Sequence, residues 1–119
     1  MKYIGTIVGI KSNYGSIYNI VSIDTKCRAW KANVVAELLG KMILITFNWN
    51  GELYEVRLSL LKENYYTGKI FYNGENGGEV FLWCYNQNDA LLLKGDFVED
   101  DVGNYDCFIE LKQLEKTLA

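Results

Sequence analysis

The side chains available for chemistry in this chain are carboxylates, lysines, tyrosines and thiols, because the sequence contains no histidine. This absence excludes Ser-His-Asp and Cys-His nucleophiles, histidine metal sites and imidazole acid–base catalysis near neutral pH. Paired carboxylates could still act as acid and base, but only their separation in space decides this. We therefore predict that the protein is not an enzyme and assign no catalytic residue; a carboxylate-dependent enzyme is the third alternative.

The stretch Asn73–Gly78, "NGENGG", is where a phosphate-binding loop would be sought. Such loops follow the pattern GxxxxGK with Ser or Thr next, or GxGxxG at the start of a helix. Neither pattern is present, and the residues that follow, "EVFLWCY", have the composition of a strand. The stretch is therefore predicted to be the tip of a β-hairpin.

Acidic side chains crowd the segment Asp96–Asp106, "DFVEDDVGNYD". The residue order of an EF-hand calcium loop is not met, so we interpret the segment as a solvated turn and predict no metal and no cofactor. Such a cluster can attract a basic protein partner, as an inhibitor or immunity-type protein would use it. The candidate partner-facing residues are Asp96, Glu99, Asp100 and Asp101.

The three cysteines, Cys27, Cys84 and Cys107, are odd in number and lack CxxC spacing. This argues against a disulfide scaffold and against a zinc site, and favours reduced thiols. The apolar run Tyr3–Ile10 is broken by two glycines and is too short for a signal peptide or a membrane span. We expect a cytoplasmic protein that does not enter a membrane.

The formal charge is −3 and the pI is near 4.9, so the basic footprint of a nucleic-acid binder is missing. Residues 1–59 carry +3 and residues 60–119 carry −6. Bases could stack on the many tyrosines and tryptophans, but stacking platforms also need a basic groove, which only the first half offers. Nucleic acid is not an expected partner.

The 119 residues fit one domain, 1–119, and contain no proline, so glycine and asparagine mark the turns. Strands are predicted near 2–10, 17–23, 41–49, 52–61, 65–72, 79–85, 90–97 and 105–112. Asn50-Gly51 favours a two-residue hairpin. We predict an all-β fold with one short helix, an antiparallel up-and-down barrel or strongly rolled sheet of about eight strands, with a β-sandwich as the alternative.

The helix is predicted over about residues 32–39, within "KANVVAELLG". Val34, Val35, Leu38 and Leu39 have helical spacing, and Asn33 and Gly40 stand where an N-cap and a terminating glycine belong. So short a helix must lie on the sheet or cap one end of it. Residues 113–119 are expected to form a frayed tail.

A repeat is visible in the second half of the chain: residues 67–82 align without a gap with residues 94–109. Gly68 matches Gly95, and a fainter copy at residues 4–19 places Gly5 at the same point. Glycine inside a strand marks a bulge, a bend or a close backbone approach, which is how small barrels curl. In architecture, such a row of hairpins is similar to the barrels of lipocalins and avidins, and this likeness of fold implies no function.

Alternation along the repeat assigns the two faces of the strands. The residues predicted to point inward are Ile7, Ile70, Val80, Leu82, Cys84, Phe97, Tyr105, Cys107, Ile109 and Leu111. An aromatic band is predicted on the outer surface, with Phe71, Phe81, Trp83, Tyr85 and Phe108. The alternatives are that these rings fill the interior or that the helix covers them.

We predict a non-enzymatic binding or interaction module that uses this band as an interface, with a protein partner or by self-association. The alternative is a small-molecule-binding barrel of lipocalin- or avidin-like architecture, with its ligand in the interior or the mouth and the helix as a lid. Its interior ligand candidates are Tyr3, Tyr66, Tyr72 and Phe97. A packed or a hollow interior separates the two predictions.

Overall fold

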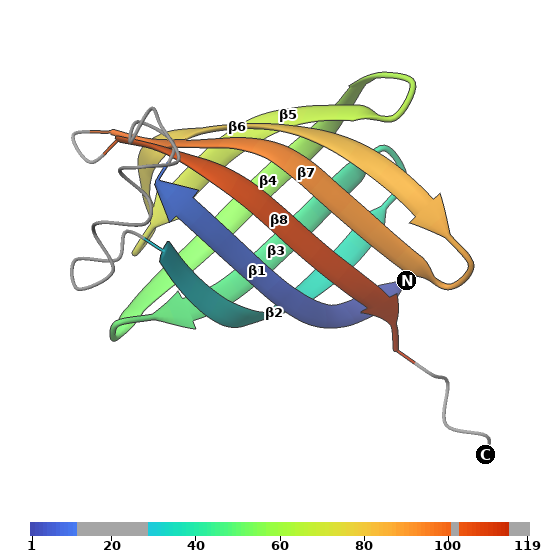
Figure 1. The fold of residues 1–119 in the computed structure, drawn as a ribbon, viewed down its shortest axis with the longest axis horizontal. Coiled ribbons are helices and arrows are strands. Elements are labelled where there is room, and N and C mark those ends of the chain that lie inside the picture. Colours follow the sequence, from blue (N-terminus) through green and yellow to red (C-terminus); the bar gives the residue numbers. More distant parts are fainter. Residues whose placement is uncertain (12–28, 101–102, 115–119) are drawn as a thin grey trace, which may run out of the picture.

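A computed structural model of the chain describes residues 1–11, 29–100 and 103–114. These residues form a closed antiparallel barrel in which each strand pairs with the next and β1 also pairs with β8 (Figure 1). The strands are β1 (Lys2–Lys11), β2 (Ala29–Leu39), β3 (Met42–Trp49), β4 (Glu52–Lys62), β5 (Tyr65–Tyr72), β6 (Glu75–Gln87), β7 (Ala90–Glu99) and β8 (Gly103–Gln113). The prediction of an up-and-down barrel of about eight strands is confirmed.

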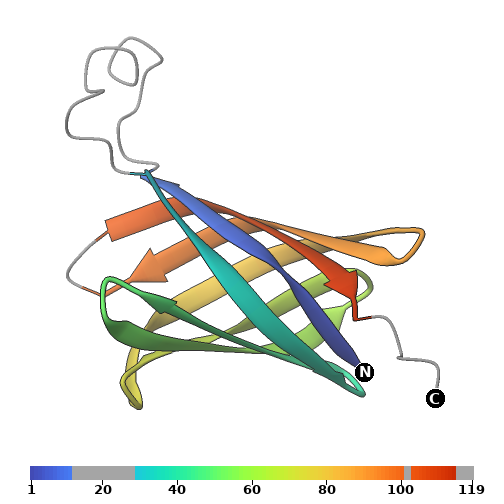
Figure 2. The same cartoon turned by 90° about the horizontal axis from the view of Figure 1, so that it is seen from below.

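Two-residue turns with positive φ angles join several strands, and they define the two ends of the barrel (Figure 2). The turns Asn50-Gly51 and Asn73-Gly74 lie at one end, which we call the mouth. The turns at residues 40–41, 63–64 and 88–89 lie at the opposite end, beside Met1. Asparagine and glycine tolerate positive φ at little cost, so these residues fix the hairpins that the sequence marks.

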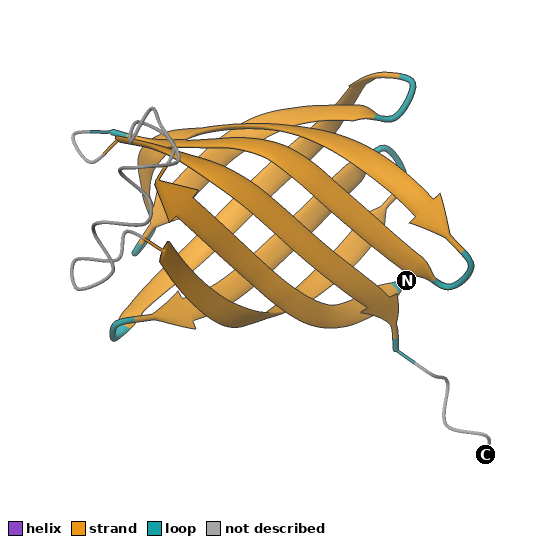
Figure 3. Cartoon of the chain, viewed as in Figure 1, coloured by secondary structure: helices purple, strands orange, loops and turns teal. Residues whose placement is uncertain are grey.

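The predicted helix over 32–39 is wrong, because these residues belong to strand β2 and all ordered elements of the described residues are strands (Figure 3). Ala32, Val34 and Ala36 are buried while Asn33 and Val35 are exposed, which is the period of a strand. The inward residues are small, and small side chains weaken the apolar signal of a strand. Hydrogen bonding to β1 and β3 then overrides local helical spacing.

The other predicted strands correspond to β1 and to β3 through β8, whereas the predicted strand 17–23 lies outside the described residues. The predicted tail begins at the last residue of β8, and its residues 115–119 also lie outside them. Within the described part of the chain, no helix is long and apolar enough to cross a membrane.

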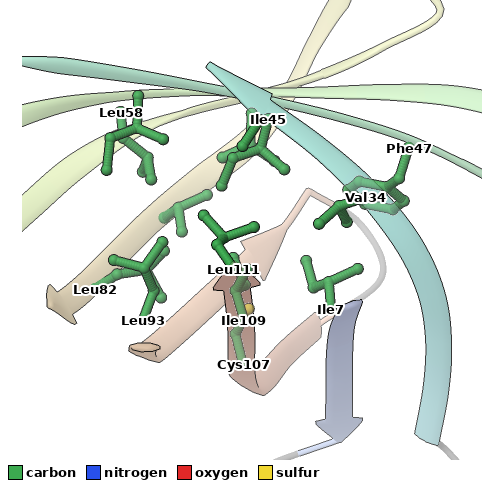
Figure 4. Close-up of a cluster of buried hydrophobic side chains, with 14 of the residues drawn as sticks. Ile7, Val34, Ile45, Phe47, Leu58, Leu82, Leu93, Cys107, Ile109 and Leu111 are labelled. Carbon is green, nitrogen blue, oxygen red and sulfur yellow. The ribbon is translucent and has the colours of Figure 1, made fainter. Parts of the chain in front are cut away.

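The interior of the barrel is packed with apolar side chains, which converge from the strands in Figure 4. Every residue that the repeat assigns to the inside is buried. The largest side chains with less than 2 % exposure are Ile7, Ile43, Ile45, Val56, Leu58, Ile70, Val80, Leu82, Leu93, Phe97, Ile109 and Leu111. This answers the question of a packed or hollow interior: the middle of the barrel is filled by its own side chains.

Three glycines at matching points of the repeat let neighbouring backbones approach closely. A Cβ atom added to Gly5, Gly68 or Gly95 would lie 1.7, 1.8 or 1.9 Å from a carbonyl oxygen of the adjacent strand. No side chain fits in that space, so the predicted bending role of these glycines has a steric basis. They explain how short strands coil tightly enough to close a barrel.

The stretch Asn73–Gly78 is the hairpin tip that the sequence predicts. Asn73 and Gly74 form the turn with φ angles of 49° and 90°. The register then shifts, because Ile70 pairs with Gly78 while Phe71 pairs with Asn76, which leaves Gly77 as the extra residue of a β-bulge. Such a bulge bends its strand and increases the local twist of the sheet.

Candidate functional site

A cavity of about 240 Å³ opens at the mouth of the barrel, above the packed interior. It is lined by Trp30, Phe47, Trp49, Tyr54, Tyr72, Glu99 and Tyr105. A second hollow of about 410 Å³ adjoins it and shares Tyr54, Tyr72 and Glu99 as lining residues. We call the two together the mouth pocket.

The aromatic side chains of the mouth pocket form one connected cluster. Phe47 stacks on Tyr54, with ring centroids 5.0 Å apart and an interplanar angle of 6°. On its other side Phe47 stacks on Trp30 at 5.8 Å and 15°. Tyr72 meets Tyr54 edge-on at 5.0 Å, and Tyr105 meets Trp30 edge-on at 5.9 Å. The pocket walls are therefore largely ring faces and ring edges held by their neighbours.

Strand register builds this cluster. Phe47, Tyr54 and Tyr72 are direct partners across β3, β4 and β5, so their rings meet on the inner face. Trp30, on β2, lies opposite Gly9 on β1. A Cβ atom at Gly9 would be 2.5 Å from the Trp30 ring, so the glycine makes room for the indole to lie across the mouth.

The rim of the pocket holds a hydrogen-bonded carboxylate. Glu52 accepts a hydrogen bond from Asn73 Nδ2 at 2.7 Å and another from the Tyr72 hydroxyl. The bond to Glu52 and partial burial raise the pKa of the Tyr72 phenol. Asn73 also accepts a hydrogen bond from the Leu53 backbone, so the two turns at the mouth are tied together.

A second carboxylate, that of Glu99, lines both parts of the pocket. The pKa of the Tyr54 phenol is raised, first by burial and then by the negative charge of Glu99. Tyr54 therefore stays protonated over the whole physiological pH range. The pocket combines neutral aromatic surface with negative charge.

The two cysteines of the described residues are buried in the barrel and unpaired. Burial raises the pKa of the Cys107 thiol to about 12, and burial also raises the pKa of Cys84. A thiol acts as a nucleophile only as the thiolate, so neither residue is activated at neutral pH. Cys27 lies outside the described residues.

The predicted interior ligand residues separate into two pairs. Tyr72 lines the mouth pocket and Phe97 packs against Trp30 at 5.4 Å. Tyr3 and Tyr66 belong to the strand ends on the opposite side, where Tyr3 is buried and Tyr66 packs against the core. Their proposed lid does not exist, since residues 32–39 form a strand.

Sequence reasoning missed several residues of the pocket: Trp30, Phe47, Trp49, Tyr54 and Tyr105 as ligand-lining side chains. A signal was present for three of them. Phe47 and Trp49 alternate on one side of the Asn50-Gly51 turn, and Tyr54 stands opposite Phe47 across it. Trp30 was missed because a helix was predicted from about residue 32, so the segment around it was not interpreted as a strand with an inward face.

The predicted aromatic band does face outward, and Trp83 and Tyr85 are 43 % and 52 % exposed. Phe71, Phe81 and Phe108 are partly covered. Register places Trp83 within a row that we call the outer row: Lys62, Tyr65, Trp83, Lys94 and Phe108. The Lys62 ammonium lies 5.3 Å from the Trp83 ring and 5.4 Å from the Tyr65 ring, within range of cation–π attraction.

The predicted acidic residues do not form one surface. Asp96 lies on the outer wall, directly opposite Asp106. Glu99 and Asp100 line the mouth pocket, and Asp101 lies outside the described residues. Among the residues that the structure describes, no three Cys, Asp or Glu side chains are placed to hold a metal ion.

Comparison of the chain with known proteins finds no relative whose function could be compared with this site. No protein-family model, no curated protein and no solved structure matches the chain.

Proposed function

We propose that the protein is a non-enzymatic binding module that holds a small, mainly apolar ligand in the mouth pocket. The observation that supports this most is the connected ring cluster that lines a cavity of about 240 Å³. Ligand sites in proteins are concave, are lined by apolar and aromatic side chains, and begin at about 300 Å³. The adjoining hollow of about 410 Å³ gives a ligand further room.

Two features favour binding over catalysis. The buried thiols have raised pKa values and are not thiolates at neutral pH. The phenols of Tyr54 and Tyr72 also have raised pKa values, so they stay protonated at neutral pH and cannot accept a proton there. The pocket therefore offers shape and apolar surface, and hydrogen bonding at its rim, without an activated nucleophile among the described residues.

The test compares two tryptophans of similar exposure. Trp49, 38 % exposed, lines the pocket, whereas Trp83, 43 % exposed, lies on the outer wall. Binding of two neutral probes, indole and 1-naphthol, is measured by ligand-observed NMR for the protein and for the variants Trp49→Ala and Trp83→Ala. We expect Trp49→Ala to weaken binding about tenfold and Trp83→Ala to leave it unchanged.

The opposite pattern, or no binding of either probe to the unaltered protein, would remove the proposal. Native mass spectrometry of the purified protein adds an independent readout, because a resident ligand appears as extra mass. Loss of that mass in Trp49→Ala alone is the expected result.

The outer row supports a second proposal, self-association of the protein. Exposed aromatic side chains anchor protein interfaces, and here they lie beside Lys62 and Lys94. These cations complement the carboxylates of a second copy, such as Asp96 and Asp106. The sequence-based hypothesis was a basic partner. The described neighbours of the exposed aromatic residues are instead lysines, which attract an acidic surface.

Size-exclusion chromatography with light scattering tests this second proposal. The unaltered protein is expected to elute above its monomer mass, and Trp83→Lys as a monomer with the same circular dichroism spectrum. A monomeric unaltered protein at every concentration, or a variant that still associates, contradicts self-association through this row.

A further inference from the structure

We propose that the protein forms a two-fold symmetric dimer through two neighbouring rows of its outer wall, one basic and one acidic, so that each row lies against the opposite row of the second copy. This inference rests on the proposed self-association and names its symmetry and its pairs of residues. The strands that carry both rows, β6, β7 and β8, lie side by side on one wall of the barrel (Figure 1).

The first row is the central part of the outer row. Trp83, Lys94 and Phe108 are direct register partners across β6, β7 and β8. Trp83 is 43 % exposed and Lys94 is exposed beside it. The Lys94 ammonium lies 5.9 Å from the centre of the Phe108 ring. This row therefore presents an exposed aromatic side chain next to a positive charge.

The second row lies two residues away along the same strands, on the same face, because outward side chains recur with a period of two. It consists of Phe81, Asp96 and Asp106, and we call it the acidic row. Asp96 and Asp106 are exposed and directly opposite each other, an arrangement of like charges that destabilises a sheet. A cation brought by another molecule relieves this repulsion.

No described side chain of the same copy supplies that cation. The ion pair among the described residues joins Arg57 to Glu55, and neither aspartate of the acidic row takes part in it. Lys94 lies on the same strand as Asp96, yet the two form no ion pair. Both charges are therefore available to a second copy of the chain.

Symmetry brings the two rows together. A two-fold axis that lies in the plane of contact, between the rows and parallel to them, places each row over the opposite row of the second copy. Because Lys94 and Asp96 are both on β7, Lys94 of one copy then faces Asp96 of the second copy. Trp83 faces Phe81 in the same way, since both are on β6. Each of these pairs occurs twice in the dimer.

Other positions of this axis do not pair opposite charges. An axis on the far side of the outer row, between Lys94 and Leu92, would place the ammonium against an aliphatic side chain. An axis along the outer row itself would place Lys94 against its own copy, where like charges repel. Only the axis between the two rows joins a cation to a carboxylate, and such a contact closes at two chains.

The test reverses the charge of each partner in turn. The variants Lys94→Glu and Asp96→Lys change exposed side chains, so both are expected to keep the circular dichroism spectrum of the unaltered protein. Sedimentation velocity over a range of concentrations measures association. We expect the dissociation constant of the dimer to rise about tenfold or more in each variant alone, because two like-charge pairs replace two opposite pairs.

Mixing the two variants gives the sharper result. A dimer with one chain of each variant holds one unaltered Lys94–Asp96 pair and one pair in which both charges are reversed. We therefore expect the equimolar mixture to associate like the unaltered protein, and native mass spectrometry to show one chain of each kind in the dimer. Lys41→Glu is the matched control: it makes the same charge change in the turn at residues 40–41, away from both rows, and should leave association unchanged.

The outcomes separate this contact from self-association as such. An unaltered protein that stays monomeric overturns the proposed self-association together with this inference. If the unaltered protein associates and neither charge reversal weakens it, or if the mixture of weakened variants does not associate, self-association stands and the symmetric contact is overturned. Growth of the unaltered protein beyond two chains also overturns it.

Discussion

The indole of Trp30 occupies the space that a side chain on Gly9 would need: the two residues are register partners on β2 and β1, and an added Cβ would lie 2.5 Å from the ring. Trp30 contacts four other rings of the mouth, so one glycine on β1 sets the position of the whole aromatic cluster. The mouth pocket therefore depends on the absence of a side chain at Gly9.

Gly9→Ala should therefore displace Trp30. The clash involves the far atoms of a side chain that can turn, so we expect the barrel to fold with a loss of about 1–3 kcal/mol. In a background with Trp49→Phe and Trp83→Phe, the emission of Trp30 should shift to the red as the ring moves toward water. An unchanged spectrum and unchanged stability would contradict this role of Gly9.

Gly68→Ala should be far more damaging, because its Cβ would lie 1.8 Å from the Arg57 carbonyl oxygen and backbone cannot turn away. We expect a loss of about 3 kcal/mol or more in urea unfolding, or failure to fold. Gly77→Ala is the control, since its nearest atom is 3.4 Å away. Similar losses in both variants would show that close backbone approach at Gly68 is unimportant.

Leu82 and Trp83 are neighbours in sequence but lie on opposite faces of β6. Leu82 is fully buried, whereas Trp83 is 43 % exposed. Leu82→Ala should cost about 2–5 kcal/mol, because it removes buried methyl groups and leaves a cavity in the packed interior. Trp83→Ala should cost about 1 kcal/mol or less, mainly its contact with Tyr65. Chemical denaturation of both variants measures the difference, and the reverse order would refute the face assignment.

Stability should fall at alkaline pH, in part through Cys107. Its pKa is about 12 in the folded barrel, because of burial and then the charge of Asp96, and 9.0 is the ordinary value expected on unfolding. Above about pH 9 the unfolded chain therefore loses this proton while the folded chain keeps it, and unfolding becomes more favourable. Raised tyrosine pKa values, as at Tyr54, act in the same direction.

Cys107→Ala isolates this contribution. The difference in free energy of unfolding between the unaltered protein and the variant should shrink by about 2.5 kcal/mol between pH 8 and pH 11. Urea unfolding at intervals of pH measures it, and a difference that stays constant would contradict the raised pKa.

The sequence by itself determined the hairpins and the faces of the strands other than β2. Asn50-Gly51 and the bending glycines at positions 68 and 95 carry this information locally, since positive φ and close backbone approach require those residue types. Alternation then placed Leu82 inside and Trp83 outside, because a strand has a period of two.

Tertiary structure decided the rest. The segment 32–39 has helical spacing, and it became a strand because β1 and β3 offer it hydrogen bonds on both edges. The mouth pocket collects rings from β2, β3, β4, β5 and β8, and only the closure of β1 on β8 brings Trp30 and Tyr105 within 5.9 Å. Local sequence patterns cannot predict this contact between Trp30 and Tyr105, because it arises from the register of strands far apart in the chain.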